Sequence, residues 1–278
     1  MSPLKTQFHC AKPLQEQPGY FEVSGAHLYT VLHEVADPIG RVLLVGPFAS
    51  ERHRSYLPWV RWARFLAARN VEVLRYDYRG IGESTGSFDE MTFEDWSEDV
   101  RLLSGWLEER SPRAPLVLHG LELGAILAGR AFHQGIGDGL LLWCAPANAN
   151  EALRTTLVRW VSLEQIFKRP EERKLASDYI RAIEQGSPQE VEGYCWSSSL
   201  WRESFDFTLP EGLANEACAE SVYQRPVRIV ELGRDTVPLA KGGTPAHDEF
   251  KDFSGLFAPN LEWIVSNASA PNKRASYA

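Results

Sequence analysis

The 278-residue sequence has few cysteines, two methionines and no long apolar run. No two cysteines form a C-x-x-C pair, which argues against a zinc ribbon or a disulfide framework and favours reduced thiols. No apolar stretch approaches the roughly 18–20 residues that span a bilayer. The first twenty residues lack the apolar centre of a signal peptide. We therefore expect a cytoplasmic protein without a membrane span. The four cysteines are Cys10, Cys144, Cys195 and Cys218.

Several classes of site are also missing. The 29 Lys and Arg are outnumbered by 37 Asp and Glu, for a net charge of −8, which argues against a nucleic-acid surface. The sequence contains no H-E-x-x-H motif, no Cys/His cluster and no D-x-D-x-D-G loop, so it gives no sign of a metal site. The glycine-rich run 80–86 lacks both the G-K-[ST] of a phosphate loop and the spacing of a dinucleotide site. We therefore expect no metal and no cofactor, and leave a small-molecule ligand or a protein partner open.

What is present is a folded α/β chain. The hydrophobic fraction of 44% and charged fraction of 24% are ordinary for a globular protein. Short apolar runs alternate with stretches of helical periodicity, which predicts a mainly parallel sheet with helices on both faces. Helices are expected at 55–69, 92–110 (with Thr92 as N-cap) and 123–133. Strands are expected at 20–23, 27–34, 41–48, 71–78, 115–119, 139–145, 227–232 and 261–266.

One segment interrupts this alternation. Residues 151–226 are helix-prone and aromatic, contain no convincing strand, and are too long for an ordinary connection. We interpret them as a helical cap over one end of a core made of 20–150 and 227–278, with 1–19 as an N-terminal arm. The aromatic side chains of the cap could line an apolar pocket or form the core of the cap itself. Its basic residues alternate with acidic ones, which favours a solvated helix face.

The turn after residues 115–119 carries the strongest motif. It reads HGLELGA over residues 119–125, so that Gly120 and Gly124 flank Glu122 between a strand and a helix. This is the layout of a nucleophile elbow, in which the central residue stands on a strained turn at the carboxyl edge of the sheet. The glycines allow the strand and the helix to approach closely.

Two further motifs follow expected strands in the same order. Residues 76–86 (YDYRGIGESTG) resemble the D-x-R-G-x-G-x-S-x-G loop of α/β-hydrolases. Residues 232–238 (LGRDTVP) resemble the loop where that superfamily places its triad acid, which would be Asp235 here. The three motifs together imply an α/β-hydrolase fold with a helical cap insertion.

A closer resemblance covers residues 46–130. The segments GPFASERHRS, RYDYRGIGESTG and HGLELGA are similar to the hydrolase-like proteins encoded with bacterial exosortase systems, which accompany exopolysaccharide production. Members of that group can lack serine at the elbow. The resemblance implies an exosortase-linked role and supplies no substrate.

The expected triad departs from that of a serine hydrolase, which needs a hydroxyl nucleophile, a histidine base and an acid. Glu122 stands at the nucleophile position and Asp235 at the acid position. The histidine is expected after the last strand, near residues 267–270, which read NASA, and no histidine follows His247. The sequence therefore predicts a non-classical or catalytically silent member of the superfamily.

Two uses of the elbow glutamate remain open. The oxyanion-hole donors expected here are the N–H of Leu123 and that of Phe48 or Ala49. The Glu122 carboxylate could fold onto these donors and fill an abandoned site. Alternatively, it could act as nucleophile or base on an ester or related small substrate, together with Asp235.

The other histidines and the nearby charged residues give weaker candidates. His247 could reach the site from the segment before the last strand, although a surface position is the plainer expectation. His53 and Arg54 lie in what we expect to be a charged loop (residues 50–55) beside the oxyanion hole, as candidate binding residues. His119 is expected at a strand end, partly buried.

Overall fold

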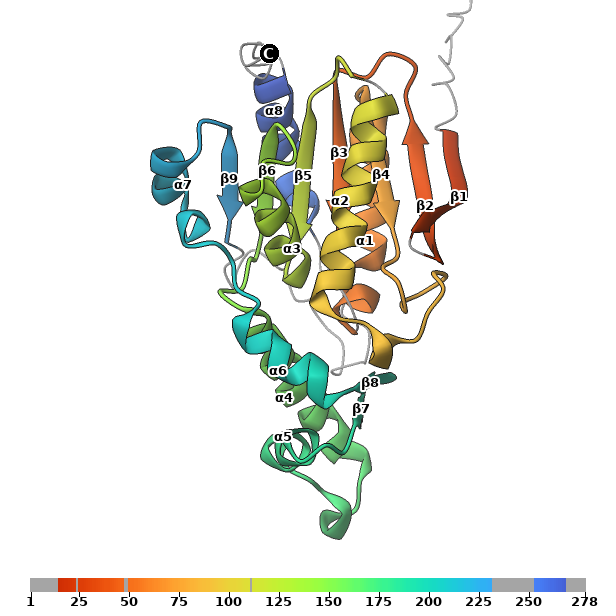
Figure 1. The fold of residues 1–278 in the computed structure, drawn as a ribbon, viewed down its shortest axis with the longest axis vertical. Helices are drawn as coiled ribbons and strands as arrows, with labels where there is room; N and C mark the ends of the chain where they lie inside the picture. The colour runs from red at the N-terminus through yellow and green to blue at the C-terminus, as the bar shows by residue number, and fades with distance from the viewer. Residues whose placement is uncertain (1–14, 24, 48–49, 111, 232–252, 269–278) are drawn as a thin grey trace, which may run out of the picture.

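The computed structural model describes residues 15–23, 25–47, 50–110, 112–231 and 253–268, and these contain a seven-stranded sheet (Figure 1). The strand order is β1-β2-β4-β3-β5-β6-β9. Strands β3, β4, β5, β6 and β9 are parallel to one another, while β1 and β2 form an antiparallel hairpin at one edge. The α/β prediction is therefore confirmed. The strands are β1 (Gln15–Val23), β2 (Ala26–Glu34), β3 (Gly40–Val45), β4 (Val71–Tyr76), β5 (Leu116–Leu121), β6 (Gly139–Trp143) and β9 (Val227–Val230).

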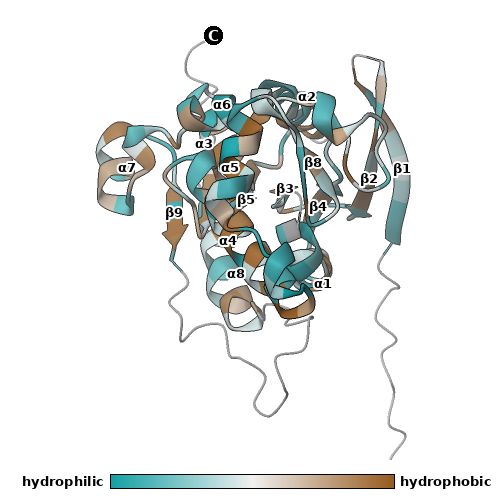
Figure 2. Ribbon diagram, turned by 90° about the horizontal axis from the view of Figure 1, so that it is seen from below, coloured by the Kyte–Doolittle hydropathy of each residue, from teal (hydrophilic) through white to brown (hydrophobic). Residues whose placement is uncertain are grey.

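The first strand is longer than expected. β1 begins at Gln15, and residues 15–19, which we had assigned to the N-terminal arm, pair with β2 throughout. Pro18 is tolerated because β1 is an edge strand, where a residue without a backbone N–H need not break a hydrogen bond to a neighbouring strand. Seen from the cap side, this hairpin forms one edge of the molecule, and β9 with its neighbouring helix forms the other (Figure 2).

Helices cover both faces of the sheet, as predicted. Helices α1 (Ser50–Ala67) and α8 (Ser254–Ala268) pack on one face, and α2 (Phe93–Arg110) and α3 (Leu123–His133) pack on the other (Figure 1). α2 begins with the expected cap: the N–H of Asp95 donates to Thr92 Oγ1 at 3.1 Å, and the Thr92 N–H donates back to the Asp95 carboxylate. The charged loop expected at residues 50–55 is instead the first turns of α1.

The strand expected at 261–266 is wrong. These residues lie inside α8, and the buried positions Phe257, Asn260 and Ile264 of that helix recur every three or four residues. That spacing places them on one helical face. The run LEWIVS is short and apolar, so periodicity within it alone could not separate a buried strand from a buried helix face.

The segment between β6 and β9 forms a layer at the carboxyl ends of the parallel strands (Figure 1). It is mostly helical, but it also holds a small antiparallel hairpin, β7 (Gln189–Val191) with β8 (Tyr194–Trp196), which we had not expected. α7 (Glu216–Val222) belongs with the core, since it packs beside β9. The other elements here are α4 (Ala149–Phe167), η2 (Pro170–Glu172), α5 (Ala176–Glu184), α6 (Ser198–Asp206) and η3 (Glu211–Leu213).

Most cap aromatics form the core of the cap. Tyr179, Trp196, Trp201 and Phe207 are buried, and the rings of Trp196 and Trp201 stack at 6.4 Å. Phe167, at the tip of α4, is 71% exposed. Within the described residues, no helix is long and apolar enough to cross a bilayer.

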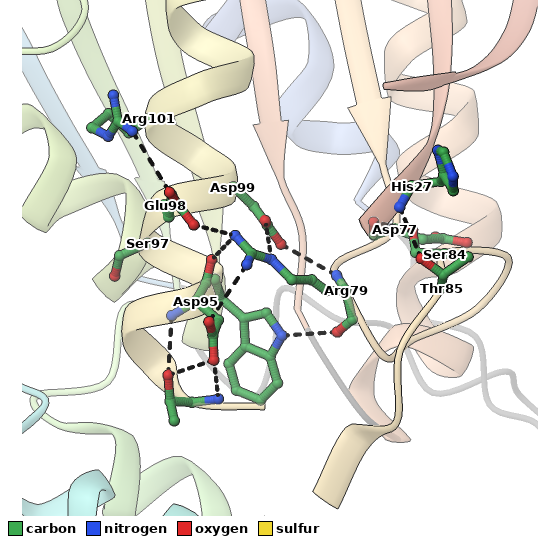
Figure 3. A network of polar contacts seen from close by, with 12 residues as sticks. His27, Asp77, Arg79, Ser84, Thr85, Asp95, Ser97, Glu98, Asp99 and Arg101 are labelled. Carbon is green, nitrogen blue, oxygen red and sulfur yellow. Dashed lines mark hydrogen bonds and ion pairs between the residues drawn. The ribbon is translucent and has the colours of Figure 1, made fainter. Parts of the chain in front are cut away.

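The glycine-rich loop after β4 is a structural clamp (Figure 3). The Arg79 guanidinium donates to Asp99 at 2.7 Å and to Glu98 at 2.8 Å, both on α2. Burial raises the pKa of Asp99 to about 6, against the lowering effect of the Arg79 charge. The hydroxyl of Ser84 bonds to the Asp77 carbonyl and to the N–H of Tyr29. This loop therefore ties β2, β4 and α2 together. The short helix η1 (Phe88–Glu90) follows it.

Candidate functional site

Glu122 stands on a strained turn between β5 and α3. Its φ of 53° and ψ of −122° lie outside the regions that ordinary residues favour. Such strain persists where the surroundings enforce it, and it clusters at functional sites. Cys144, at the end of the neighbouring strand β6, also has a positive φ of 52°. Two strained residues thus lie side by side at the carboxyl edge of the sheet.

The glycines on either side of Glu122 explain how the turn closes. A Cβ on Gly124 would lie 2.2 Å from the Val45 carbonyl oxygen, so only glycine lets α3 approach the end of β3 this closely. A Cβ on Gly120 would lie 2.4 Å from the Cα of Ala125. The predicted elbow is therefore present in geometry as well as in sequence.

The Glu122 side chain does not cap α3. Its backbone N–H donates to the Trp143 carbonyl at 2.9 Å, which joins the turn to β6. The side chain makes no capping hydrogen bond to the first turn of the helix.

Glu122 instead lines a cavity of about 450 Å³ between the sheet edge and the cap. The volume suits a small organic molecule. The core contributes residues from the ends of β5, β6 and β9 and from the start of α1, and the cap contributes α4 and β8. The apolar part of the lining consists of Pro47, Leu123, Ala145, Pro146, Ala152, Leu153 and Trp196.

The charges around the cavity are mainly negative. Arg159 on α4 forms ion pairs with Glu51 on α1 and, at 3.1 Å, with Glu192 in the β7–β8 turn. This places a bridge between core and cap at the cavity wall. Glu231, directly after β9, and Glu151 add carboxylates, while Arg54 adds a second guanidinium.

The structure brings together three of the predicted site residues. Glu122, Leu123 and Arg54 line the same cavity. His53 is exposed on α1, with its ring 6.4 Å from that of Tyr194, and is not part of the lining. The predicted residues outside the described part of the chain are Phe48, Ala49, Asp235 and His247.

His119 has no place in the site. It lies in the middle of β5, fully buried rather than at a strand end, and its Nδ1 accepts from Trp62 Nε1 at 3.0 Å. The rings of Trp59, Trp62 and Trp143 surround it. Burial holds the pKa of His119 well below its usual range. It is therefore a neutral member of the core.

Helix α8 occupies part of the region where the sequence predicts the position of a triad histidine. Residues 267 and 268, where we expected one, end this helix rather than follow a strand. The connection from β9 to α8 spans residues 231–253 and carries both Asp235 and His247 in its sequence. Among the described residues, no group of His, Cys, Asp and Glu side chains could hold a metal ion.

Sequence reasoning missed several lining residues. Glu231 could have been found, because it directly follows the strand VRIV, at the edge where the acid of this fold is expected. The sequence predicts a solvated helix face for Arg159, but Arg159 and Trp196 both line the cavity. Their positions there depend on how the cap packs on the core, which no local sequence pattern specifies.

Comparison with solved structures identifies the fold. An α/β hydrolase, GrgF from Penicillium sp. sh18, matches with a TM-score of 0.58 and 15% identity over 92% of this chain and 99% of that one. The chain has the α/β-hydrolase fold. Est1E from Butyrivibrio proteoclasticus, solved with ferulic acid bound, matches with a TM-score of 0.57 and 14% identity over 90% of this chain and 98% of that one.

A family model matches part of the chain. Residues 52–178, less than half of the chain, match a family described as serine aminopeptidase S33. A serine hydrolase without a lid, XC6422 from Xanthomonas campestris, has 23% identity and a TM-score of 0.42, over 49% of this chain and 63% of that one. No protein of curated function matches the sequence.

Proposed function

We propose that this α/β-hydrolase-fold protein binds a small organic ligand in the cavity between the elbow and the cap, and does not carry out acyl-serine chemistry. The observation that carries the proposal is the side chain at the elbow. The turn keeps the strained geometry of a nucleophile position, but Glu122 stands there and lines the cavity. A carboxylate cannot form the acyl-serine intermediate of a serine hydrolase.

Binding can be tested by filling the cavity. A fragment library is screened by thermal shift on the wild type and on Ala152→Phe, which adds a ring to the cavity wall on α4. Fragments that raise the melting temperature of the wild type should lose their effect on Ala152→Phe. Val158→Phe is the matched control, because Val158 is 55% exposed on the same helix and lies outside the lining. Equal fragment responses in all three proteins would contradict the proposal.

A second candidate function is hydrolysis of an ester or a related small substrate, with Glu122 as nucleophile or base. The observation favouring it is that the β9–α8 connection, which starts at the cavity with Glu231, carries both Asp235 and His247. If this function is right, Asp235→Asn and His247→Gln reduce turnover as strongly as Glu122→Gln. Retained turnover in the first two variants would exclude the triad.

The biological setting follows only from the sequence resemblance over residues 46–130. On that basis we place the protein in an exosortase- or exopolysaccharide-linked system, in the cytoplasm, with a small ligand or a protein as its partner. Deleting the gene in a strain that carries such a system, and measuring exopolysaccharide output, tests this assignment. Unchanged output would remove its support.

A further inference from the structure

A second, smaller cavity lies beside the loop that follows β3. Its volume is about 30 Å³, and its wall includes Gly46, Pro47, Ser55 and Arg75. Pro47 lines this cavity and also the one at Glu122. One water needs about 10–15 Å³ of such space, so the smaller cavity has room for a water or a small ion.

Ser55 has a hydroxyl group with no protein partner. The residue is 1% exposed, and its Oγ is buried without a hydrogen bond. Serines inside helices commonly donate to the carbonyl four residues earlier, and Ser97, Ser104 and Ser162 do so here. Ser55 lines the small cavity instead. A buried hydroxyl left unpaired is destabilising, so an occupant that accepts a hydrogen bond from it would stabilise the protein.

Arg75 is a half-buried cation without a counter-ion among the described residues. Its Nε donates to His33 Nε2 at 3.3 Å, and burial lowers the pKa of His33 to about 4, so that histidine is neutral at pH 7. The neighbouring Glu16 forms an ion pair with Arg64. Arg75 lines the small cavity, and its guanidinium carbon lies 5.8 Å from the centroid of the Tyr56 ring.

The other charged residues at this cavity do not neutralise Arg75. Asp77 also lines it, but both of its carboxylate oxygens accept from Arg52 at 2.7 Å, and one also accepts from the Glu83 N–H at 3.1 Å. Arg52 and Asp77 therefore neutralise each other, and Arg75 contributes one unbalanced positive charge. A partly buried guanidinium without an ion pair favours an anion beside it.

We propose that this cavity is a binding site for a small monovalent anion of chloride size, held between the Arg75 guanidinium and the Ser55 hydroxyl. The anion supplies a counter-charge to Arg75 and accepts a hydrogen bond from the Ser55 hydroxyl. Because Gly46 and Pro47 form part of the wall, the bound anion supports these two residues, and Pro47 also lines the cavity at Glu122. The inference does not depend on the proposed function.

The test compares thermal unfolding in sodium chloride and in sodium gluconate at equal ionic strength, since gluconate is too large for the cavity. Chloride should raise the melting temperature of the wild type in a saturable way. Ser55→Ala and Arg75→Met should lose most of this increase. In gluconate, Ser55→Ala should be at least as stable as the wild type, because it removes an unpaired hydroxyl.

Ser104→Ala is the matched control, since it removes a buried helical hydroxyl that already donates to Val100. It should keep the full chloride effect. Equal melting temperatures of the wild type in the two salts would mean that water alone fills the cavity, and would overturn the proposal. A chloride effect that survives in Ser55→Ala would overturn it as well. A bromide-soaked crystal should show an anomalous peak between Arg75 and Ser55.

Discussion

Gly124 lets helix α3 approach strand β3 to backbone contact. We expect Gly124→Ala to destabilise the protein by about 1–3 kcal/mol, because its Cβ would press on the Val45 carbonyl. Gly105→Ala, inside α2 with open space around the added Cβ, should instead stabilise by up to about 1 kcal/mol. Urea unfolding of both variants measures the difference. Equal effects would show that close approach is not what requires glycine at the elbow.

The elbow residues were predictable because the requirement is local. A strand, a strained turn and two glycines are adjacent in sequence, so Gly120, Glu122 and Gly124 could be assigned from the motif alone. The orientation of the Glu122 side chain could not, because it follows from a backbone conformation and from a cavity wall supplied by the cap.

Strand β2 carries a histidine whose burial makes the stability of the protein depend on pH. The pKa of His33 is lowered to about 4, by burial first and by the Arg75 charge second, from an ordinary value of 6.5. The unfolded chain therefore binds more protons between these two values, so this contribution is present above pH 6.5 and is lost as the pH falls toward 4.

We expect His33→Gln to reduce this pH dependence. Between pH 7 and pH 5, the wild type should lose about 1–2 kcal/mol more stability than the variant. Urea unfolding at the two pH values checks this. His27→Gln, which changes an exposed histidine on the same strand, should behave like the wild type. If the stability of His33→Gln depends on pH as strongly as that of the wild type, the pH dependence does not come from His33.

At the same scale, most elements could be predicted, but α8 and the β7–β8 hairpin could not. The strands 71–78 and 139–145 overlap β4 and β6, because continuous apolar runs between turns are typical of buried parallel strands. The run 261–266 is also mostly apolar but lies in α8. Its helical face, marked by the buried residues Phe257, Asn260 and Ile264, is visible only over a longer window.

Across the whole molecule, Arg159 joins the cap to the core through its ion pairs with Glu51 and Glu192. We expect Arg159→Met to cost about 1–2 kcal/mol and to speed hydrogen exchange in α4 and the β7–β8 hairpin, because the pairs are partly shielded from water. Arg169→Met is the control, since Arg169 pairs with Glu172 on the exposed tip. Similar exchange in both variants would mean that this bridge does not hold the cap.

The contacts of the cap were the least predictable feature. The length and aromatic content of residues 151–226 predict an insertion, but the hairpin β7–β8 and the placement of Trp196 at the cavity depend on long-range packing. The expected position of a triad histidine, near residues 267–270, was inferred from a strand at 261–266, and these residues lie in α8 instead.

We propose that the elbow glutamate makes this site a binding site rather than the active site of an ester hydrolase. The most direct measurement is hydrolysis of short- and medium-chain p-nitrophenyl esters by purified wild type, Glu122→Gln and Glu122→Ser, side by side. We predict no turnover above the uncatalysed rate in any of the three proteins. Turnover by the wild type that disappears in Glu122→Gln would contradict the claim and make Glu122 a catalytic residue.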